Sequence, residues 1–131
     1  KVAIMGLAFK QDTNDTRNSP SIDLVNFLTE RNVAEIRAYD PVAMPTFQAI
    51  FPDHPKLKYA VHENEAATGA DIIILATDWP QFRGLADFLI KENQGGLIMD
   101  GRRLLAHRYS DLQTAGYDIV AVGSPMIKGQ K

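Results

Sequence analysis

The sequence contains no cysteine among its 131 residues. This absence excludes disulfides, thiolate metal sites and cysteine nucleophiles within the chain. A strong excess of one charge is also lacking, because 14 basic and 16 acidic residues leave a net charge of −2 at pH 7. No broad cationic surface is therefore expected for binding nucleic acid or an anionic membrane, and any anion site must be local.

Long apolar stretches are missing as well. Apolar runs such as residues 72–76 are far shorter than the ~20 residues needed to cross a bilayer. Nothing at the start resembles the charged and then apolar pattern of a signal peptide. With 45% apolar residues and a length typical of one domain, the chain is expected to be a soluble, cytoplasmic single domain without membrane partners.

Apolar runs alternate with helical patterns along the chain. Residues 1–9 and 71–77 are nearly continuous apolar runs, which are typical of strands buried on both faces. Shorter strands are predicted at residues 36–40, 59–61, 97–100 and 119–122. Further helices are predicted at about residues 44–51, 63–69, 82–91 and 105–115.

The first helix has a clear start signal. Ser19 is a favourable N-cap residue, and Pro20 follows it at the first helical position. Ile22, Val25 and Leu28 then recur at helical spacing. The pattern predicts a helix of about three turns.

Strands that alternate with helices in this way predict an α/β fold. The simplest topology is a three-layer, Rossmann-like, doubly wound parallel sheet of about six strands in the order 3-2-1-4-5-6. We expect residues 1–123 to form this domain and residues 124–131 to be a fraying C-terminal tail. Because the first residue already lies in a strand expected at the centre of the sheet, we also expect the chain to be a piece of a longer polypeptide.

Candidate ligand-binding residues follow the central strands. Open parallel sheets bind ligands at the carboxyl ends of their strands, beside the point where the strand order reverses. Phe9 and Lys10 end the first strand, and Arg102 follows the fifth, so the two cations should lie roughly 10 Å apart, about the span of a nucleoside diphosphate. The placement predicts a site for a phosphorylated ligand. The alternative is that Lys10 and Arg102 are surface charges paired with Asp12 or Asp100.

Other features of a dinucleotide-binding domain are incomplete. The loop after the first strand has one glycine, Gly6, where the fingerprint needs three, so the pyrophosphate cradle is missing. Asp40 stands where such domains bind a ribose hydroxyl, but Pro41 follows it, which favours a turn former. Trp79 has the chemistry to stack on a base, although a tryptophan after a buried strand more often packs beneath its own loop.

Arg17 lies just before the first predicted helix, whose N-terminal dipole disfavours a cation. Either an anionic partner compensates for this placement or Asp15 does, and both interpretations stay open. The histidines, His54, His62 and His107, are scattered without metal-ligand spacing. No metal site is therefore expected, and no nucleophile elbow is present.

Four motifs occur in order along the chain. Residues 6–20, Gly-Leu-Ala-Phe-Lys-Gln-Asp-Thr-Asn-Asp-Thr-Arg-Asn-Ser-Pro, fit the pattern G-x-x-F-K-x-x-T-x-D-x-R-x-S-P. Ala-Tyr-Asp-Pro follows at 38–41, Thr-Asp-Trp-Pro-Gln-Phe-Arg at 77–83 and Asp-Gly-Arg at 100–102. Together they cover nearly the whole chain and resemble the C-terminal, UDP-binding domain of the UDP-glucose/GDP-mannose dehydrogenase family. Residues 15–17 and 79–83 are most similar to its UDP-glucose 6-dehydrogenase branch.

The resemblance implies a parent enzyme that converts UDP-glucose, two NAD and water to UDP-glucuronate and two NADH. The family does so through a thiohemiacetal and a thioester on a cysteine, so this chain, which has none, is expected to be inactive alone. By the same resemblance, Phe9, Lys10 and Arg102 bind the UDP-sugar, and Arg17 contacts NAD, which is held mainly by an N-terminal domain. The implied partners are the N-terminal and central domains and further copies in a homo-oligomer.

Three alternatives stay open. The parent enzyme could act on another nucleotide sugar, of the GDP-mannose or UDP-N-acetylmannosamine type. The chain could instead be a non-enzymatic Rossmann-like module that binds NAD directly, or a domain that serves only subunit assembly. Residues 123–125 read Gly-Ser-Pro rather than the Gly-Arg common in bacterial members, so family contacts from that region are not carried over.

Overall fold

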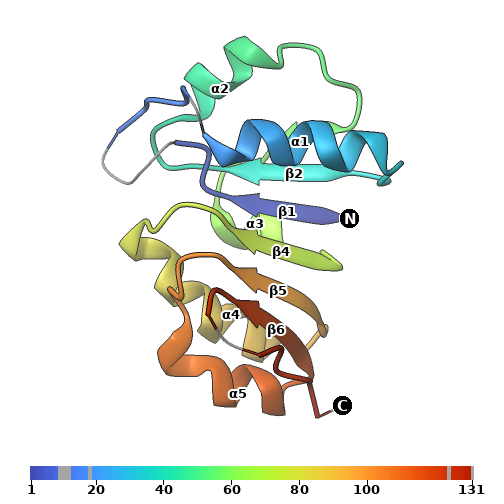
Figure 1. The fold of residues 1–131 in the computed structure, drawn as a ribbon, viewed down its shortest axis with the longest axis vertical. Coiled ribbons are helices and arrows are strands. Elements are labelled where there is room, and N and C mark those ends of the chain that lie inside the picture. Colours follow the sequence, from blue (N-terminus) through green and yellow to red (C-terminus); the bar gives the residue numbers. More distant parts are fainter. Residues whose placement is uncertain (9–12, 18, 124, 131) are drawn as a thin grey trace.

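The parallel sheet predicted from the sequence is present. The computed structural model describes residues 1–8, 13–17, 19–123 and 125–130 (Figure 1). Its six strands lie in the predicted order β3-β2-β1-β4-β5-β6, and every neighbouring pair is parallel. The strands are β1 Val2–Met5, β2 Ile36–Tyr39, β3 Leu57–Tyr59, β4 Ile72–Leu75, β5 Gly96–Asp100 and β6 Tyr117–Ala121.

Helices form the outer layers. Side chains of α1 (Pro20–Glu30) and α2 (Met44–Ile50) pack into the core on one face of the sheet. Those of α3 (Glu63–Ala67), α4 (Leu85–Glu92) and α5 (Tyr109–Thr114) pack on the other face. Short 3₁₀ turns, η1 (Pro80–Gly84) and η2 (Ala106–Arg108), precede α4 and α5. No described helix has the length and apolar character needed to span a bilayer.

Strand β1 is buried on both faces, as its apolar run predicts. Ala3 and Met5 belong to the core beneath α3, α4 and α5. Val2 and Ile4 belong to the core beneath α1 and α2. A strand with alternating polar residues would leave one of these two cores incomplete.

Helix α1 begins as predicted and is anchored to the end of β1. The Ser19 side chain accepts a hydrogen bond from the Ser21 amide at 3.2 Å, and Pro20 occupies the first helical position. The buried Ser21 hydroxyl donates to the Gly6 carbonyl at 2.7 Å. The helix start is therefore fixed to the loop that leaves the central strand.

Several predicted boundaries differ from the structure. Strand β6 begins two residues before the strand predicted at 119–122, and the start of the helix predicted at 82–91 belongs to η1. Strand β3 lies two residues earlier than predicted, because Leu57 enters the core opposite Ile36, while Val61 is 79% exposed. The predicted helix at residues 105–115 is divided into η2 and α5. The Leu105 amide donates to Asp100 at 2.8 Å, so this end of the segment is held in a turn.

The C-terminal end is attached to the sheet rather than frayed over its described residues. Ile127 and Ile119 exchange two backbone hydrogen bonds, of 2.8 and 2.9 Å, in an antiparallel bridge. The Gly129 amide also donates to the Asp118 carboxylate at 2.7 Å. Residues 127–130 thus cover the outer edge of β6, while the division of the chain at residue 123 stays a prediction.

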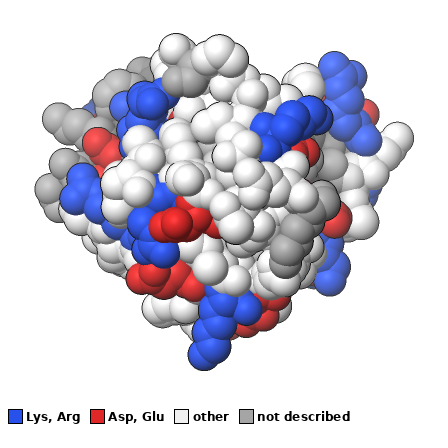
Figure 2. Space-filling view, turned by 90° about the horizontal axis from the view of Figure 1, so that it is seen from below, with Lys and Arg blue, Asp and Glu red and all other residues white. Residues whose placement is uncertain are grey.

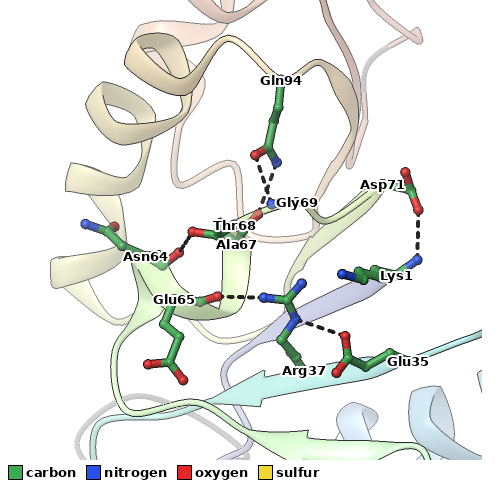
Figure 3. Close-up of polar contacts among 10 residues, drawn as sticks. All are labelled: Lys1, Glu35, Arg37, Asn64, Glu65, Ala67, Thr68, Gly69, Asp71 and Gln94. Atoms are coloured by element: carbon green, nitrogen blue, oxygen red, sulfur yellow. Dashed lines mark hydrogen bonds and ion pairs between the residues drawn. The ribbon is translucent and has the colours of Figure 1, made fainter.

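Polar contacts at the amino edge of the sheet serve the fold (Figure 3). Arg37 lies 3.4 Å from the Glu35 carboxylate and donates to the Glu65 carbonyl at 3.0 Å. Gln94 donates to the Ala67 carbonyl at 3.0 Å and accepts from the Gly69 amide at 3.0 Å. These side chains join α3 to the strands and to the turn before β5.

One sheet face is only partly covered by described helices. Helices α1 and α2 cover β1, β2 and β3 and bury Ile74 of β4, whereas no described helix lies over the same face of β5 and β6 (Figure 1). Met99 of β5 and Val122 after β6 are 37% and 63% exposed. Phe27 on the neighbouring side of α1 is 51% exposed. The carboxyl edge of the sheet therefore borders a partly apolar, open surface.

Candidate functional site

The loops after β1 and β4 meet at the point where the strand order reverses. Gly6 has φ +104°, and a Cβ at this position would lie 2.4 Å from the Thr77 Cβ. The buried Thr77 hydroxyl donates to the Ala8 carbonyl at 2.9 Å. Only glycine can adopt this φ and allow such a close approach. The single glycine of the loop therefore joins the two central strands.

Asp40, fully buried at the end of β2, organises this junction. Its Oδ2 accepts hydrogen bonds from the Leu7 and Ala8 amides at 2.8 and 3.1 Å. The same oxygen accepts from the Trp79 indole at 3.1 Å. Its Oδ1 accepts from the two amides of the following turn, Val42 and Ala43, each at 2.8 Å. One carboxylate thus joins the loops after three strands.

These contacts decide between the two interpretations of Asp40. Both carboxylate oxygens lie inside the protein and already accept five N–H groups, so Asp40 has no exposed oxygen for a ribose hydroxyl. Its role in turn formation is confirmed. The Leu7 and Ala8 amides are also committed to Asp40, so these two amides are not free to cradle a dinucleotide pyrophosphate.

Trp79 packs inside the protein. Its side chain is 7% exposed and belongs to the core beneath α3, α4 and α5, together with the fully buried Phe82. With its indole N–H bound to Asp40, Trp79 is not available as a stacking surface for a base. The interpretation that it packs beneath its own loop is confirmed.

Asp100, at the end of β5, is a second buried carboxylate with the same function. Its Oδ1 accepts from the Arg102 and Leu104 amides at 3.3 and 2.9 Å. Its Oδ2 accepts from the Leu105 amide and the Tyr109 hydroxyl, both at 2.8 Å. Burial, together with this hydrogen bond, raises the pKa of Tyr109. The turn after β5 is therefore wrapped around one carboxylate.

The guanidinium of Arg102 is presented to solvent by that turn. Its side chain is exposed, and Nε donates to the Ala76 carbonyl at the end of β4 at 3.3 Å. Asp100 holds the Arg102 backbone, and no carboxylate of the described residues forms an ion pair with its guanidinium. The alternative interpretation, an ion pair between the Arg102 guanidinium and the Asp100 carboxylate, is therefore wrong.

A groove opens beside Arg102. It encloses about 660 Å³ between α1 and the ends of β4 and β5. Leu24 and Phe27 of α1 line one wall, and Ile74, Gly101 and Arg102 lie on the other. Figure 2 shows the molecule from the β6 side, where acidic and basic side chains lie near one another among uncharged atoms. A cation at the mouth of a mainly apolar groove suits an anion attached to a less polar group.

Arg17 forms an exposed pair with Asp15 in the loop before α1. Its Nε and Nη2 donate to the two carboxylate oxygens at 3.0 and 2.9 Å, and its amide donates at 2.9 Å. These hydrogen bonds lower the pKa of Asp15 to about 2. Asp15 therefore compensates the charge that the helix dipole disfavours, while the pair remains open to solvent.

Phe9 and Lys10, the other predicted ligand-binding residues, lie outside the described residues, as does Asp12. The described loop ends at Ala8, and residue 13 resumes it. In the described part of the chain, no three His, Asp or Glu side chains are arranged to hold a metal ion. Two histidines have local roles: His54 contacts the Thr29 hydroxyl at 3.0 Å, and His62 accepts from the Asn64 amide at the start of α3.

The sequence interpretation identified Asp40 as a turn former but missed its contacts with the loops after β1 and β4, and it missed the role of Asp100. Asp40 and Asp100 are each the last residue of a predicted strand, and each accepts hydrogen bonds from backbone amides within the next five residues. An aspartate at a strand end before a turn is the available signal. The long-range donors Leu7, Ala8 and Trp79 are visible only once the fold is known.

Comparison with known proteins agrees with the sequence motifs. Residues 3–107 match the model of the UDP-glucose/GDP-mannose dehydrogenase family, UDP binding domain. The UDP-glucose 6-dehydrogenase TuaD of Bacillus subtilis is 32% identical over 129 residues, which are 98% of this chain and 27% of that protein. The UDP-glucose 6-dehydrogenase AglM of Haloferax volcanii is 37% identical over 82% of this chain and 24% of that protein.

A solved structure has the same fold. The UDP-glucose dehydrogenase of the hyperthermophilic archaeon Pyrobaculum islandicum superposes with a TM-score of 0.69 at 31% identity. The superposition covers 82% of this chain and 23% of that one. The chain therefore spans about a quarter of the length of the relatives that it matches.

Proposed function

Because this chain belongs to the UDP-glucose/GDP-mannose dehydrogenase family, we propose that it is the UDP-sugar-binding domain of an NAD-dependent UDP-glucose 6-dehydrogenase. Both relatives compared above, TuaD and AglM, carry that enzyme name. The chain alone is proposed to be inactive, since it contains no cysteine to form the covalent intermediates of the reaction. Dehydrogenases of related nucleotide sugars remain the alternative for the parent enzyme.

One observation carries the proposal. Arg102 has an exposed guanidinium at the carboxyl ends of β4 and β5, without an ion pair among the described residues, on a turn held by buried Asp100. Guanidinium groups bind phosphate oxygens by charge-assisted, often bidentate hydrogen bonds. We propose that Arg102 binds the diphosphate of the UDP-sugar together with Lys10, and that Phe9 contacts the same ligand.

NAD is proposed to bind mainly outside this chain. The loop after β1 has one glycine, and its Leu7 and Ala8 amides are bound to Asp40, which argues against a dinucleotide cradle here. Arg17 is proposed as the contact of this chain with NAD. Its exposed pairing with Asp15 leaves the charge accessible, and a phosphate could replace the carboxylate as its partner.

The remainder of the enzyme is proposed to complete the ligand cleft. The relatives are more than three times as long as this chain. The groove beside Arg102 and the exposed Phe27 and Met99 provide an apolar surface next to the carboxyl edge. N-terminal and central domains, a homo-oligomeric parent and a cytoplasmic location remain predictions.

The direct test is calorimetric titration of this chain with UDP and with NAD separately. We expect measurable UDP binding and weaker NAD binding. Lys10→Ala and Arg102→Ala should each weaken UDP binding by about 1.5–3 kcal/mol, the value of a charge-assisted hydrogen bond. Lys58→Ala, which removes an exposed cation from the edge strand β3, is the matched control and should bind UDP like the wild type.

Two outcomes would contradict the proposal. Preferential binding of NAD would indicate the non-enzymatic dinucleotide-binding module. Unchanged UDP affinity in both Lys10→Ala and Arg102→Ala would make these residues ordinary surface charges. Incubation of the chain with UDP-glucose and NAD should give no NADH, and steady NADH production would reject the assignment to a partial enzyme.

The NAD contact needs a separate comparison in the complete enzyme. Arg17→Ala should raise the KM for NAD more than the KM for UDP-glucose, because Arg17 is proposed to contact only the cofactor. Equal effects on both constants would argue against that role. Asp15→Ala, which frees Arg17 without removing it, should leave NAD binding intact.

A further inference from the structure

We propose that Asp40 and Asp100 are positioning residues, each holding the loop that carries one of the two phosphate-binding cations. This inference rests on the proposed function, since it assigns Lys10 and Arg102 to the same ligand. Each carboxylate lies at the end of a strand and is fully buried. Each uses both of its oxygens to bind N–H or O–H groups of the protein.

Asp40 serves the loop after β1. Its Oδ2 binds the Leu7 and Ala8 amides at 2.8 and 3.1 Å, and Lys10 lies two positions further along the chain. Its contact with Trp79 ties the same oxygen to the segment after β4. The last two described residues before the Lys10 segment are therefore held by this carboxylate.

Asp100 serves the turn after β5. It binds the amides of Arg102, Leu104 and Leu105, so three of the five residues after it are held by one side chain. Tyr109 donates its hydroxyl to Oδ2 and fixes the carboxylate against the start of α5. The position of the Arg102 guanidinium depends on this turn, because its backbone is bound to Asp100 and its Nε to the Ala76 carbonyl.

A carboxylate is the only side-chain group of this size in which both terminal atoms accept hydrogen bonds. Replacement by asparagine keeps the shape but turns an NH₂ group toward two or three N–H or O–H donors. For Asp40 those donors are Leu7, Ala8 and Trp79, or Val42 and Ala43 if the amide is reversed. Either orientation leaves buried donors without an acceptor, so the affected loop must move.

The two carboxylates hold different loops, and this separates positioning from general stabilisation. If Asp40 acts through Lys10, its replacement should matter little once Lys10 has been removed. The same holds for Asp100 and Arg102. A residue that only stabilises the fold would weaken binding by the same factor whichever cation is present.

Double-mutant cycles on UDP affinity test this directly. Asp40→Asn and Asp100→Asn should each weaken UDP binding on the order of tenfold, as expected for a displaced charge-assisted hydrogen bond. The loss from Asp40→Asn should largely disappear in a Lys10→Ala background and persist in Arg102→Ala. The loss from Asp100→Asn should show the reverse. The combinations of Asp40→Asn with Arg102→Ala and of Asp100→Asn with Lys10→Ala are thus internal controls.

Additive losses in all four cycles would overturn the positioning role, as would Asn variants that bind UDP like the wild type. A wild-type chain that does not bind UDP would overturn the proposed function and this inference with it. If an Asn variant does not fold, Trp79→Phe replaces Asp40→Asn, and Tyr109→Phe replaces Asp100→Asn. Each removes one hydrogen bond to the carboxylate, and the same pairing is expected with smaller losses.

Amide hydrogen exchange supplies a readout without ligand. In Asp40→Asn, the Leu7 and Ala8 amides should exchange at least about tenfold faster, while the Leu104 and Leu105 amides keep their protection. Asp100→Asn should show the opposite pattern. Uniform acceleration at all four amides would indicate a loss of global stability and contradict a local positioning role.

Discussion

At the scale of single residues, the carboxyl edge of the sheet combines buried acceptors with exposed charges. Asp40 and Asp100 are buried and bind protein N–H groups, whereas Arg17 and Arg102 extend into solvent. A buried carboxylate is stable only when its oxygens are fully hydrogen-bonded, and both aspartates meet that condition. The backbone of Arg102 is therefore held by a buried carboxylate, whereas Arg17 is paired with Asp15 at the surface.

The ion pair in the loop before α1 gives a prediction about pH. Hydrogen bonds from Arg17 lower the pKa of Asp15 from its ordinary value of 3.8 to about 2. Because the folded pKa is lower than the unfolded one, the pair stabilises the loop above about pH 4 and is lost as the pH falls toward 2. An NMR titration of the Asp15 carboxyl carbon should give a midpoint near 2, and Arg17→Ala should return it toward 3.8. Midpoints near 3.8 in both proteins would contradict the pairing.

The close contact at Gly6 gives a prediction about stability. Gly6→Ala combines an unfavourable φ with a Cβ only 2.4 Å from the Thr77 Cβ, so it should lower the free energy of unfolding by about 1–3 kcal/mol or more. Gly84→Ala is the matched control, because its φ is −68° and a Cβ there meets no atom within 4 Å. It should be neutral or slightly stabilising in urea unfolding. Equal stability of the two variants would contradict the close approach of β1 and β4.

Residue roles could be predicted from the sequence only where they depend on near neighbours. The helix start at Ser19 and the compensation of Arg17 by Asp15 involve residues two positions apart, and both are present. The placement of Arg102 at a strand end also follows from the motif and the topology. One of the five hydrogen bonds to Asp40 comes from Trp79, 39 positions away. The full role of Asp40 therefore depends on the tertiary structure.

At the scale of elements, apolar continuity made the central strands easy to predict. Strands β1 and β4 are buried on both faces, and their runs contain no polar residue that would mark a solvent face. Edge strand β3 was harder, because exposed Val61 extends the apolar pattern beyond the strand. The register with β2, which places Leu57 opposite Ile36, decides where β3 begins.

The C-terminal segment provides a prediction at this scale. The bridge between Ile127 and Ile119 should protect both amides from exchange with solvent, since each donates to the other residue's carbonyl. Hydrogen-exchange mass spectrometry of the intact chain should show slow exchange at residue 127. Replacing Asp118 with alanine removes the acceptor of the Gly129 amide and should accelerate exchange there. Full exchange of residue 127 within seconds in the wild type would restore the picture of a fraying tail.

At the scale of the whole molecule, the carboxyl and amino edges of the sheet differ. Helices α1 and α2 cover only part of their sheet face (Figure 1), and the groove beside Arg102 lies between α1 and the ends of β4 and β5. The amino edge, by contrast, uses Arg37 and Gln94 for contacts within the fold (Figure 3). This asymmetry agrees with a domain that presents its carboxyl edge to a nucleotide sugar and to the rest of an enzyme.

Arg102, in the turn after β5, and Lys10 are proposed to bind the diphosphate of a UDP-sugar together. A crystal structure of this chain with UDP, grown from protein whose UDP binding has been measured by calorimetry, tests this proposal most directly. We predict phosphate oxygens within hydrogen-bond distance of both the Arg102 guanidinium and the Lys10 ammonium. Bound UDP whose phosphates contact neither side chain would contradict the account.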